Sequence, residues 1–574
     1  MNQRIFRIIP PSFRRRAVRA TVCIFLRALL NFVGLAVLIP VLVLIVDARN
    51  IHANTYLNRA YEWLGFTDER AFAVAVCAAV VGIVAAKCLL SLALFKVERN
   101  FTFDLYRHLS RKLYTTYHDR GLSFIKNSNS AVLTRNVNVV SLTFVAGVLK
   151  PMAAIASECI LFVMIFAALA LYNPTAAVLA AAIFVPAAAF YYLLVRKRLV
   201  RYGDEENRAH RAKARCVSET FRGYSDIEIN DAFDRMLHTF DEQQQRIISL
   251  RKRSDTIGAL PQMFTELGLV LGMAAIVVCL GTDGRRTEIL FGILAVAALR
   301  LMPSIRNIMS GWTAIKYNLY TIDVLLEADL DTEERMRADD SSRLPLKDCI
   351  RVENISFRFD DDRSEREIFS NLSLTIRRGE RLGIRGTSGA GKTTLFNILL
   401  GFYAPTSGRI TIDGVPLDAT TRRRWQNAVG YVSQNVFITD SSFAQNVALG
   451  AAPDDIDRRR VHQALEAADL AEFVESLPKG MDTPIGECGC RLSGGQRQRI
   501  GIARALYKQA DVLFFDEATS SLDNRTEESI NRSISELSER NRELTIVVIA
   551  HRESSLDYCD RIITVGNDDT DSRI

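Results

Sequence analysis

Although the 574-residue sequence contains ten cysteines, it lacks the sets of close pairs that a disulfide framework or a zinc site needs. The cysteines are scattered through apolar and charged stretches alike, which argues against structural disulfides. Cys488 and Cys490 lie close together, but no second pair with zinc spacing accompanies them. Ordinary loop cysteines are therefore a better interpretation of these two residues than a zinc site.

Internal repeats, low-complexity tracts and a large charge imbalance are also missing. The net charge is +7 and the isoelectric point is near 8.8. Arginines beside apolar runs account for most of this excess, because anionic lipid headgroups attract such residues. The composition therefore gives no reason to expect a nucleic-acid partner.

Long apolar runs are what the chain has in abundance. Hydrophobic residues make up 49% of it, and the mean hydropathy is +0.08. Before residue 313 they collect into runs of about the 20 residues that a helix needs to cross a bilayer. The first run follows an arginine-rich start, as in a secretory signal, but it is too long for a signal and is expected to remain as a span. The predicted spans cover residues 20–46, 71–95, 144–171, 175–195, 261–280 and 289–312.

The distribution of lysine and arginine predicts the orientation of these spans. Residues 96–143 and 196–260 are rich in both, whereas the other intervals are short or nearly balanced, with Arg285 and Arg286 as exceptions. Basic intervals stay on the cytoplasmic side of a membrane. We therefore expect the amino terminus, both basic intervals and the region after residue 335 to be cytoplasmic.

Both basic intervals have the pattern of helices that continue out of the membrane. They contain few proline or glycine breakers, and their apolar residues recur at helical spacing. Short breaks near residues 121–130 and 221–230 predict that each interval turns back on itself. From the residues alone, these could be ordinary helical hairpins.

A phosphate-binding loop follows the apolar half of the chain. The segment Gly386-Thr-Ser-Gly-Ala-Gly-Lys-Thr393 fits GxxxxGK[ST] and lies between a strand-like run and a helical stretch. Its glycines allow backbone N–H groups to turn toward phosphate oxygens at a helix N-terminus. We expect Lys392 to reach the β- and γ-phosphates of ATP and the Thr393 hydroxyl to hold Mg²⁺.

Two further segments complete the ATP-handling pattern. The apolar run Val512-Leu-Phe-Phe ends in Asp516 and Glu517, as expected of a buried parallel strand that presents acids at its carboxyl edge. Asp516 is predicted to hold Mg²⁺ and Glu517 to polarise the attacking water. Between loop and strand, Leu492-Ser-Gly-Gly-Gln496 opens a helix and offers a second anion site.

Together these motifs resemble the ATP-binding cassette (ABC) family, whose signature is Leu-Ser-Gly-Gly-Gln. The resemblance implies that the signature meets ATP on a second copy, that Ser521-Leu522-Asp523 is the D-loop of the family, and that residues 483–489 relay to the membrane domain. It implies catalytic roles for Gln434, Glu517 and His551, and Mg²⁺ ligation by Thr393, Gln434 and Asp516. The implied nucleotide-binding residues are Phe359 (on adenine), Gly386, Ser388, Gly389, Gly391, Lys392, Thr393, Thr394, Ser493, Gly494, Gly495, Gln496 and Asp523.

The implied fold is a membrane α-helical domain with six transmembrane helices, fused to a cytoplasmic α/β P-loop nucleotide-binding domain. We predict the membrane domain over residues 1–335, a linker over 336–345 and the cassette over 346–574. One cassette cannot complete a site shared between two copies, so we expect a homodimer. Because Glu517 and His551 are both present, we expect an active ATPase. Similarity to ABC exporters implies that the two cytoplasmic turns are coupling helices.

Ionisable residues inside the predicted spans bear on the substrate, because charge at such depth faces a cavity or a partner. Lys87, Arg300 and Arg306 are the principal cations, and two or more in one cavity suit a phosphate or pyrophosphate group. Structural pairing with Glu158 or Glu266 is the alternative. Arg27, in the first span, could equally reach toward the cytoplasmic surface.

The membrane half is similar to flippases of lipid-linked oligosaccharides from bacterial protein N-glycosylation. That similarity rests on Ala298-Leu-Arg-Leu-Met-Pro-Ser304, the region of residues 41–47 and the fifth span. It implies that Lys87 and Arg300 meet a pyrophosphate, with Gln262 at a position where that group has arginine. Lysine lacks the bidentate fork of arginine, so these departures bear on affinity or substrate identity. Residues 55–66 could form the short amphipathic helix of that group, or an ordinary interfacial helix.

The sequence therefore predicts an ATP-driven flippase of a polyprenyl-pyrophosphate oligosaccharide in a bacterial cytoplasmic (inner) membrane. One alternative is an ABC exporter of another substrate: a lipid of the lipid A type, a drug or a peptide. Such an exporter would depend less on Lys87 and Arg300. Another alternative, of a different class, is an ATP-gated regulatory membrane protein, which rapid steady ATP turnover would count against.

Overall fold

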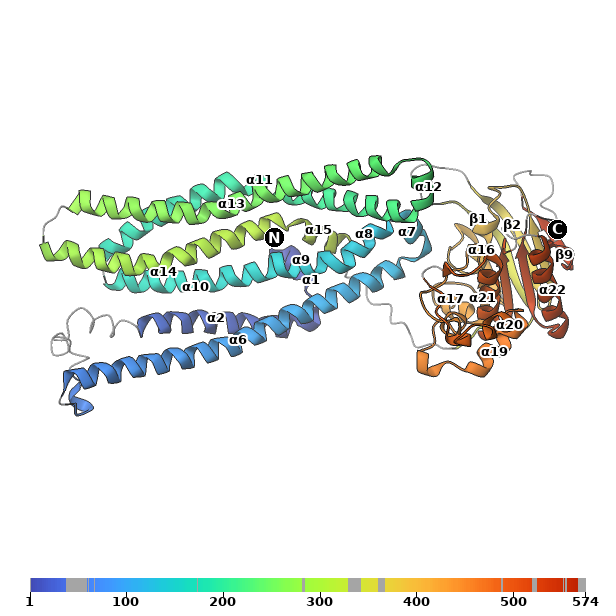
Figure 1. Cartoon of the computed structure of the whole chain (residues 1–574), viewed down its shortest axis with the longest axis horizontal. Coiled ribbons are helices and arrows are strands. Elements are labelled where there is room, and N and C mark those ends of the chain that lie inside the picture. The colour runs from blue at the N-terminus through green and yellow to red at the C-terminus, as the bar shows by residue number, and fades with distance from the viewer. Residues whose placement is uncertain are drawn as a thin grey trace. The chain divides into compact units, whose positions relative to one another are not determined.

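The computed structural model describes residues 2–37, 59, 61–66, 68–172, 174–280, 284–328, 342–359, 367–486, 489–518, 524–550, 552 and 555–565. The side chains of some helical residues, chiefly 275–300, are outside this description. The chain divides into two compact units, Met1–Glu334 and Arg335–Ile574. The first is helical and the second contains all the strands (Figure 1).

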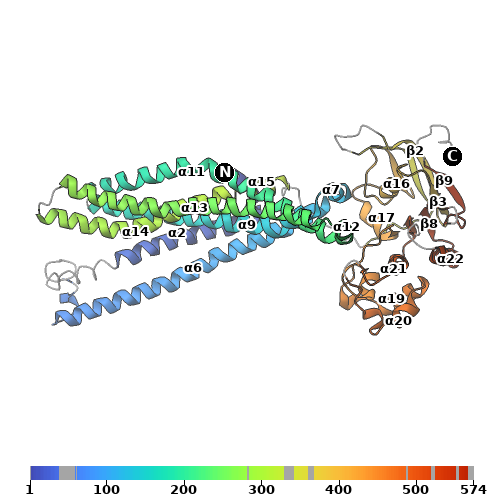
Figure 2. The same ribbon diagram turned by 45° about the horizontal axis from the view of Figure 1, so that its top comes forward.

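Long helices make up the first unit. They are α2 (Arg14–Ala36), α6 (Glu69–Asp119), α10 (Lys150–Tyr172), α11 (Pro174–Arg222), α13 (Phe233–Leu280) and α14 (Gly284–Tyr317), with α1 (Asn2–Ile8) and α15 (Tyr320–Glu327) near the ends of the unit. Helix α10 packs along α14 (Figure 1), whereas α2 packs along α6 and α11 along α13 (Figure 2). Among the residues with described side chains, Pro11–Gly34, Arg70–Asp119 and Ser130–Leu171 are apolar and long enough to cross a membrane. Residues 38–46 of the first predicted span and the region of residues 41–47 lie outside the described residues. The last three predicted spans lie within α11, α13 and α14.

Short helices occupy both breaks in the basic intervals. Helix α7 (Gly121–Asn127) follows α6, and α12 (Tyr224–Ile229) joins α11 to α13. Between α7 and α10 the chain continues through α8 (Ser130–Arg135), α9 (Ser141–Phe144) and two π-helical turns, η2 (Asn136–Val140) and η3 (Val145–Leu149). The predicted turns are therefore present.

Two sheets form the framework of the second unit. An antiparallel sheet has the order β2-β1-β4-β5, with β1 Cys349–Phe357, β2 Phe369–Arg377, β4 Ser407–Ile412 and β5 Val415–Pro416. A parallel sheet has the order β6-β7-β8-β3-β9, with β3 Arg381–Arg385, β6 Val429–Val432, β7 Val512–Asp516, β8 Thr545–Ile549 and β9 Arg561–Thr564. Every residue of β7 and β8 is buried, as expected for central parallel strands.

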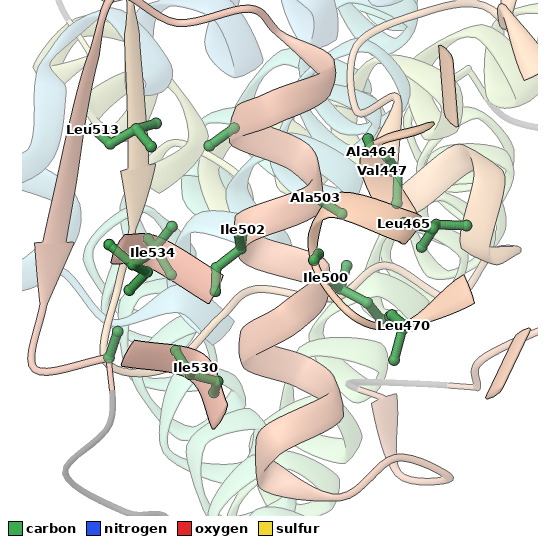
Figure 3. Packing of buried hydrophobic residues seen from close by; sticks show 14 of the residues in the cluster. Val447, Ala464, Leu465, Leu470, Ile500, Ile502, Ala503, Leu513, Ile530 and Ile534 are labelled. Atoms are coloured by element: carbon green, nitrogen blue, oxygen red, sulfur yellow. The ribbon is translucent and has the colours of Figure 1, made fainter. Parts of the chain in front are cut away.

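Helices cover this parallel sheet and extend into a helical lobe. They are α16 (Lys392–Leu399), α17 (Arg422–Ala428), α18 (Phe443–Val447), α19 (Arg458–Ala467), α20 (Ala471–Glu475), α21 (Gly494–Tyr507) and α22 (Asn524–Arg540). Helix α21 is buried on two sides. Its Ile502 points toward Leu513 and Ile534, whereas Ile500 and Ala503 point toward the lobe (Figure 3). This packing fixes the helix that carries the signature.

Part of the predicted linker is attached to the second unit. Arg343 donates hydrogen bonds to the carbonyls of Gln509 (3.1 Å) and Lys508 (2.5 Å). The N–H of Leu344 donates to the Arg424 carbonyl at 3.0 Å. Residues 342–345 therefore form part of the nucleotide-binding unit.

Candidate active site

The phosphate loop connects β3 to α16. Gly389 and Gly391 have φ of +83° and +91°, a region that L-residues with side chains rarely adopt. A Cβ at Gly391 would also lie 2.5 Å from Ile368 Cγ2. Helix α16 begins directly at Lys392, so its free N–H groups face the loop. The local backbone therefore forms the cradle that the motif predicts.

Lys392 is held inside this loop. Its side chain is 5% exposed, and its Nζ donates to the carbonyls of Gly386 (2.9 Å) and Thr387 (3.1 Å). Thr393, by contrast, is exposed beside it. A buried ammonium next to exposed polar groups suits the recognition of an anionic ligand.

The carboxyl end of β7 brings an acid to this loop. Asp516 is 4% exposed, and its Oδ1 is 3.5 Å from Thr393 Oγ1. Its Oδ2 accepts a hydrogen bond from the Tyr431 hydroxyl at 3.2 Å. Burial and the adjacent Asp516 raise the pKa of Tyr431, so this hydroxyl stays protonated and remains a donor. An oxygen set of this kind, a hydroxyl beside a carboxylate, fits the preferences of Mg²⁺.

Glu517 is held in an uncommon backbone conformation beside Gln434. Its φ is +49°, an uncommon value for a residue with a side chain, and its N–H donates to the Ile549 carbonyl at 3.0 Å. Gln434 Nε2 donates to Glu517 Oε2 at 2.9 Å. The Gln434 backbone carbonyl in turn accepts from Gln498 of α21 at 2.7 Å. The two predicted catalytic residues therefore meet, and the signature helix supports the segment that holds Gln434.

The signature forms the N-terminus of α21. Ser493 Oγ accepts from the Gln496 N–H (3.2 Å), and Gln496 Oε1 accepts from the Ser493 N–H (2.9 Å). This reciprocal capping leaves Ser493 exposed and opens the helix at Gly494. Among the described residues, no hydrogen bond or ion pair joins residues 386–394 to residues 492–496. Within one chain, therefore, no described hydrogen bond or ion pair connects the phosphate loop to the signature.

Only some of the remaining residues that were predicted to bind nucleotide belong to the described part of the structure. Phe359 is 36% exposed and packs edge-on against Phe357 (5.1 Å) and Tyr403 (5.6 Å). It therefore lies at the margin of an aromatic cluster. Ser388 is exposed and Thr394 is half-buried. Asp523, His551 and Cys488 lie outside the described residues, whereas Cys490 is exposed.

The predicted substrate cations are not assembled in one place by contacts within the chain. Lys87 of α6 lies across α2, where a Cβ at Gly34 would be 3.2 Å from its Cδ. Arg306 is exposed on α14, and Gln262 is exposed on α13 and donates to Glu266 at 3.0 Å. The backbone of Arg300 belongs to α14, but its side chain is outside the described part of the structure. No contact among the described side chains therefore joins these residues in a shared anion site.

Other polar groups near the spans have structural partners. Arg27 forms an ion pair with Glu98 at 3.0 Å and faces the Phe95 ring. Glu158 of α10 accepts from Ser304 (2.7 Å) and Asn307 (3.0 Å) of α14. Of the residues predicted over 55–66, only 59 and 61–66 are described, and Trp63 is 85% exposed.

Tyr431 is the site residue that sequence reasoning missed. It lies three positions before Gln434 on β6, and β6 pairs in parallel with β7. Its register partner is Phe514, two residues before Asp516. Parallel pairing between these two segments would have suggested the contact, since both end at the same edge of the sheet.

The cassette matches the family model described as "ABC transporter" over residues 369–520. An "ATP-dependent lipid A-core flippase" of Burkholderia pseudomallei (strain 1710b) is 30% identical over 504 residues, covering 85% of this chain and 81% of the relative. The protein of the same name from Ralstonia nicotianae is 30% identical over 489 residues, covering 83% and 78%. A solved structure titled "Structure of a bacterial Atm1-family ABC exporter with ATP bound" is 24% identical, with a TM-score of 0.75 over 96% of this chain and 93% of the other.

These comparisons confirm the predicted architecture of a helical membrane domain followed by a cassette. They do not confirm similarity to flippases of lipid-linked oligosaccharides, because the full-length relatives carry a different name. That finer assignment stays a prediction, and the comparisons favour the lipid A type that the sequence left as an alternative.

Proposed function

Because this chain belongs to the ABC exporters as a half-transporter that couples ATP hydrolysis to transport, we propose that it flips an anionic glycolipid of the lipid A type across a bacterial cytoplasmic membrane. The observation that carries the proposal is 30% identity over 81% and 78% of the length of two proteins named ATP-dependent lipid A-core flippases. A glycolipid bearing phosphate also suits cations inside apolar helices, such as Lys87.

A polyprenyl-pyrophosphate oligosaccharide is the second candidate. Lys87 and Arg300 stand where the resemblance to oligosaccharide flippases implies pyrophosphate contacts. The two candidates share one chemistry, a phosphate or pyrophosphate group on a sugar attached to lipid. They differ in the lipid part and in the dependence on these two cations.

ATP would act through both motifs of the cassette. The phosphate loop and Lys392 hold the β- and γ-phosphates, and Thr393 with Asp516 would hold Mg²⁺, which neutralises charge on the phosphate oxygens when it is bound. Glu517, oriented by Gln434, positions the attacking water. His551, and Asp523 near the second copy, would complete the site.

A homodimer is required by this arrangement. The exposed signature at the start of α21 serves the ATP held by the partner's phosphate loop, so ATP closes the two cassettes over two nucleotides. Hydrolysis and product release reopen them. Helices α7 and α12 would act as the coupling helices that pass this movement to the spans.

ATPase activity in liposomes tests the proposal. We expect a lipid A-type glycolipid to stimulate the turnover of the wild-type homodimer. Lys87→Ala combined with Arg300→Ala should reduce stimulation by the lipid A-type glycolipid only in part and should abolish stimulation by a polyprenyl-pyrophosphate oligosaccharide. Arg253→Ala, which removes an exposed cation of α13, should preserve the stimulation. Glu517→Gln should lower turnover by about 10²–10⁴-fold, the usual contribution of a general base.

The outcomes separate the candidates. Stimulation by polyprenyl-pyrophosphate oligosaccharide alone would favour the second candidate. If neither glycolipid changes the turnover, the substrate proposal fails, and drugs, peptides and other lipids become the next substrates to test.

A further inference from the structure

A cavity of about 800 Å³, with several charged side chains in its walls, lies among the helices of the first unit. Its walls come from α8 and the π-helical turn η2 on one side and from α11 on the other. Arg251 of α13, the end of α14 and the start of α15 close it. Every lining residue belongs to an interval that the sequence places on the cytoplasmic side or to the segment after the sixth span, and none is among the predicted substrate cations. This volume suits a small ligand, since such sites enclose about 300–1,000 Å³.

The cavity is strongly cationic. The basic residues that line it are Arg135, His210, Lys213, Arg222 and Arg251. Glu206 is the one carboxylate among the lining residues. Glu206 Oε1 lies 3.4 Å from His210 and 3.8 Å from Arg251. The one carboxylate is therefore already shared by two basic residues.

The three other cations donate hydrogen bonds to neutral groups, and Glu206 in addition attracts Arg135 from a longer distance. Arg135 donates to Asn207 Oδ1 (2.6 Å), Lys213 to Gln244 Oε1 (2.5 Å) and Arg222 to Ser130 Oγ (3.5 Å). Among the described residues, no carboxylate lies within 4.0 Å of any of them. Arg135 and Lys213 are half-buried, and cations that are partly withdrawn from water close to one another are costly unless a counter-charge is present. This cost is offset when an anion enters, since charge-assisted hydrogen bonds are among the strongest in proteins.

The wall geometry also indicates a binding site. The turn η2 is π-helical over residues 136–140 and contributes Asn138 and Val139 to the cavity. Such turns are rare and are frequent at functional sites. Ser130, Thr134 and Asn318 add hydroxyl and amide donors beside the guanidinium groups. Donors of these kinds, arranged on several helices, match the tetrahedral oxygens of a phosphate.

We propose that this cavity binds a phosphate or pyrophosphate group carried by a sugar. The group can belong to the headgroup of a lipid in the inner leaflet or to a free sugar phosphate. If it belongs to a lipid, the phosphate must lie on an extended glycan, because the α11 residues that line the cavity, Glu206 to Arg222, lie beyond the predicted end of the span at residue 195. The site would then hold this glycan before transport, and this version rests on the proposed function. If it belongs to a soluble molecule, the site stands independently of the transported substrate.

Calorimetric binding to the purified full-length homodimer tests the proposal, with saturating Mg²⁺ and ADP to fill the phosphate loops. One arm uses glucose 1-phosphate, and the other uses nanodiscs that contain or lack a lipid A-type phosphoglycolipid. The test variant is Lys213→Gln with Arg222→Gln, and Arg135→Gln is a second variant. The controls are Arg215→Gln and Arg253→Gln, which remove exposed cations of α11 and α13 that do not line the cavity.

We expect at least one arm to bind, and binding to weaken about tenfold or more in the test variant but not in the controls, because charge-assisted hydrogen bonds are lost. Binding in the first arm identifies a soluble phosphate as a ligand, and binding in the second identifies a headgroup. Absence of binding in both arms would overturn the proposal, as would an equal loss in the controls. Because Arg135 is partly buried and its replacement can disturb folding, the double variant with the exposed Arg222 decides the outcome, with its elution from size exclusion as the check of folding. None of these readouts requires transport, so failure here differs from failure of the proposed function.

Discussion

At the scale of single residues, the contacts of Asp516 connect the phosphate loop to the neighbouring strand. Thr393 approaches one carboxylate oxygen and Tyr431 donates to the other. A partner of this kind orients a metal ligand without touching the metal, and its removal weakens metal affinity more than nucleotide affinity.

Tyr431→Phe should therefore change the Mg²⁺ dependence of ATP hydrolysis. We expect the Mg²⁺ concentration for half-maximal activity to rise roughly tenfold, as for other residues that support metal ligands. ATP binding without Mg²⁺ should stay the same. Tyr403→Phe is the control, because among the described residues the Tyr403 hydroxyl makes no hydrogen bond. An unchanged Mg²⁺ dependence in Tyr431→Phe would assign Tyr431 to packing alone.

His462 gives the cassette a stability contribution that depends on pH. Its Nε2 lies 2.7 Å from Glu475 on α20, and Glu475, followed by Glu466, raises the pKa of His462 above its usual 6.5. The stabilisation is complete below about pH 6.5 and is lost as pH rises through the folded-state pKa. The pair is largely exposed, so we expect about 0.2–1 kcal/mol.

Thermal unfolding of the full chain at pH 6 and pH 8.5 checks this effect. His462→Gln should lower the midpoint at pH 6 and leave it nearly unchanged at pH 8.5. Glu475→Gln should do the same, and the double variant should lose little more, because both changes remove one interaction. Equal losses at both pH values would rule out the charge of His462 as the cause.

The sequence could predict those residues of the candidate active site that belong to contiguous motifs. The phosphate loop, Asp516, Glu517 and Gln434 meet as expected because each has a local pattern tied to a strand end or a helix start. Tyr431 was missed because its role depends on pairing between strands about 80 residues apart in sequence. The pairing of Arg27 with Glu98 was missed for the same reason, since it joins two helices.

At the scale of elements, glycines allow the long helices to approach closely. A Cβ at Gly203 of α11 would lie 1.9 Å from the backbone oxygen of Tyr317 at the end of α14. A Cβ at Gly311 of α14 would lie 2.9 Å from Ile155 Cγ1 of α10. Gly311 lies at the end of the sixth predicted span, and small residues at helix contacts are typical of membrane bundles, where close packing replaces the hydrophobic effect. Gly203 allows a similarly close approach in the cytoplasmic part of α11.

Gly203→Ala should therefore separate α11 from α14. The obstacle is backbone rather than a flexible side chain, so we expect a loss of about 1–3 kcal/mol, the usual cost of overpacking. Gly258→Ala on α13 is the matched control, because a Cβ there has nothing within 4 Å. Heat-induced loss of monodisperse protein measures both variants. A normal melting midpoint for Gly203→Ala would show that this contact can open without cost.

The sequence predicted the helices themselves, but it did not predict their π-helical turns or the faces by which they contact one another. Long apolar runs and few breakers predicted the spans and the cytoplasmic extensions, and the breaks predicted α7 and α12. The π-helical turns η2 and η3 were not predicted, because their sequences, NVNVV and VAGVL, have no local signal that separates a π from an α turn. Which faces of the helices meet depends on glycines whose effect appears only in three dimensions.

At the scale of the whole molecule, a homodimer with shared ATP sites makes a prediction about mixed dimers. If Lys392→Ala is on one copy and Ser493→Ala on the other, both defects fall in the same shared site, and the second site stays intact. If one copy carries both changes, each shared site has one defect. We therefore expect ATP turnover to persist in the first dimer and to be nearly lost in the second.

Differently tagged copies, purified as mixed dimers, allow this comparison at equal protein concentration. A dimer of two wild-type copies with the same tags is the reference. Equal turnover in the two mixed dimers would contradict the exchange of signatures between copies.

The length of α11 and α13 has a mechanical consequence. They contain 49 and 48 residues, or roughly 73 Å at 1.5 Å per residue. A bilayer core takes up about 30 Å, which leaves a rigid arm of roughly 40 Å beyond it. An arm of that length turns a tilt of about 5° within the membrane into a displacement of roughly 3.5 Å at α12. Helices α11 and α13, joined by α12, therefore act as a lever that pivots near the membrane surface. A small change of tilt in the spans would give a large displacement of α12.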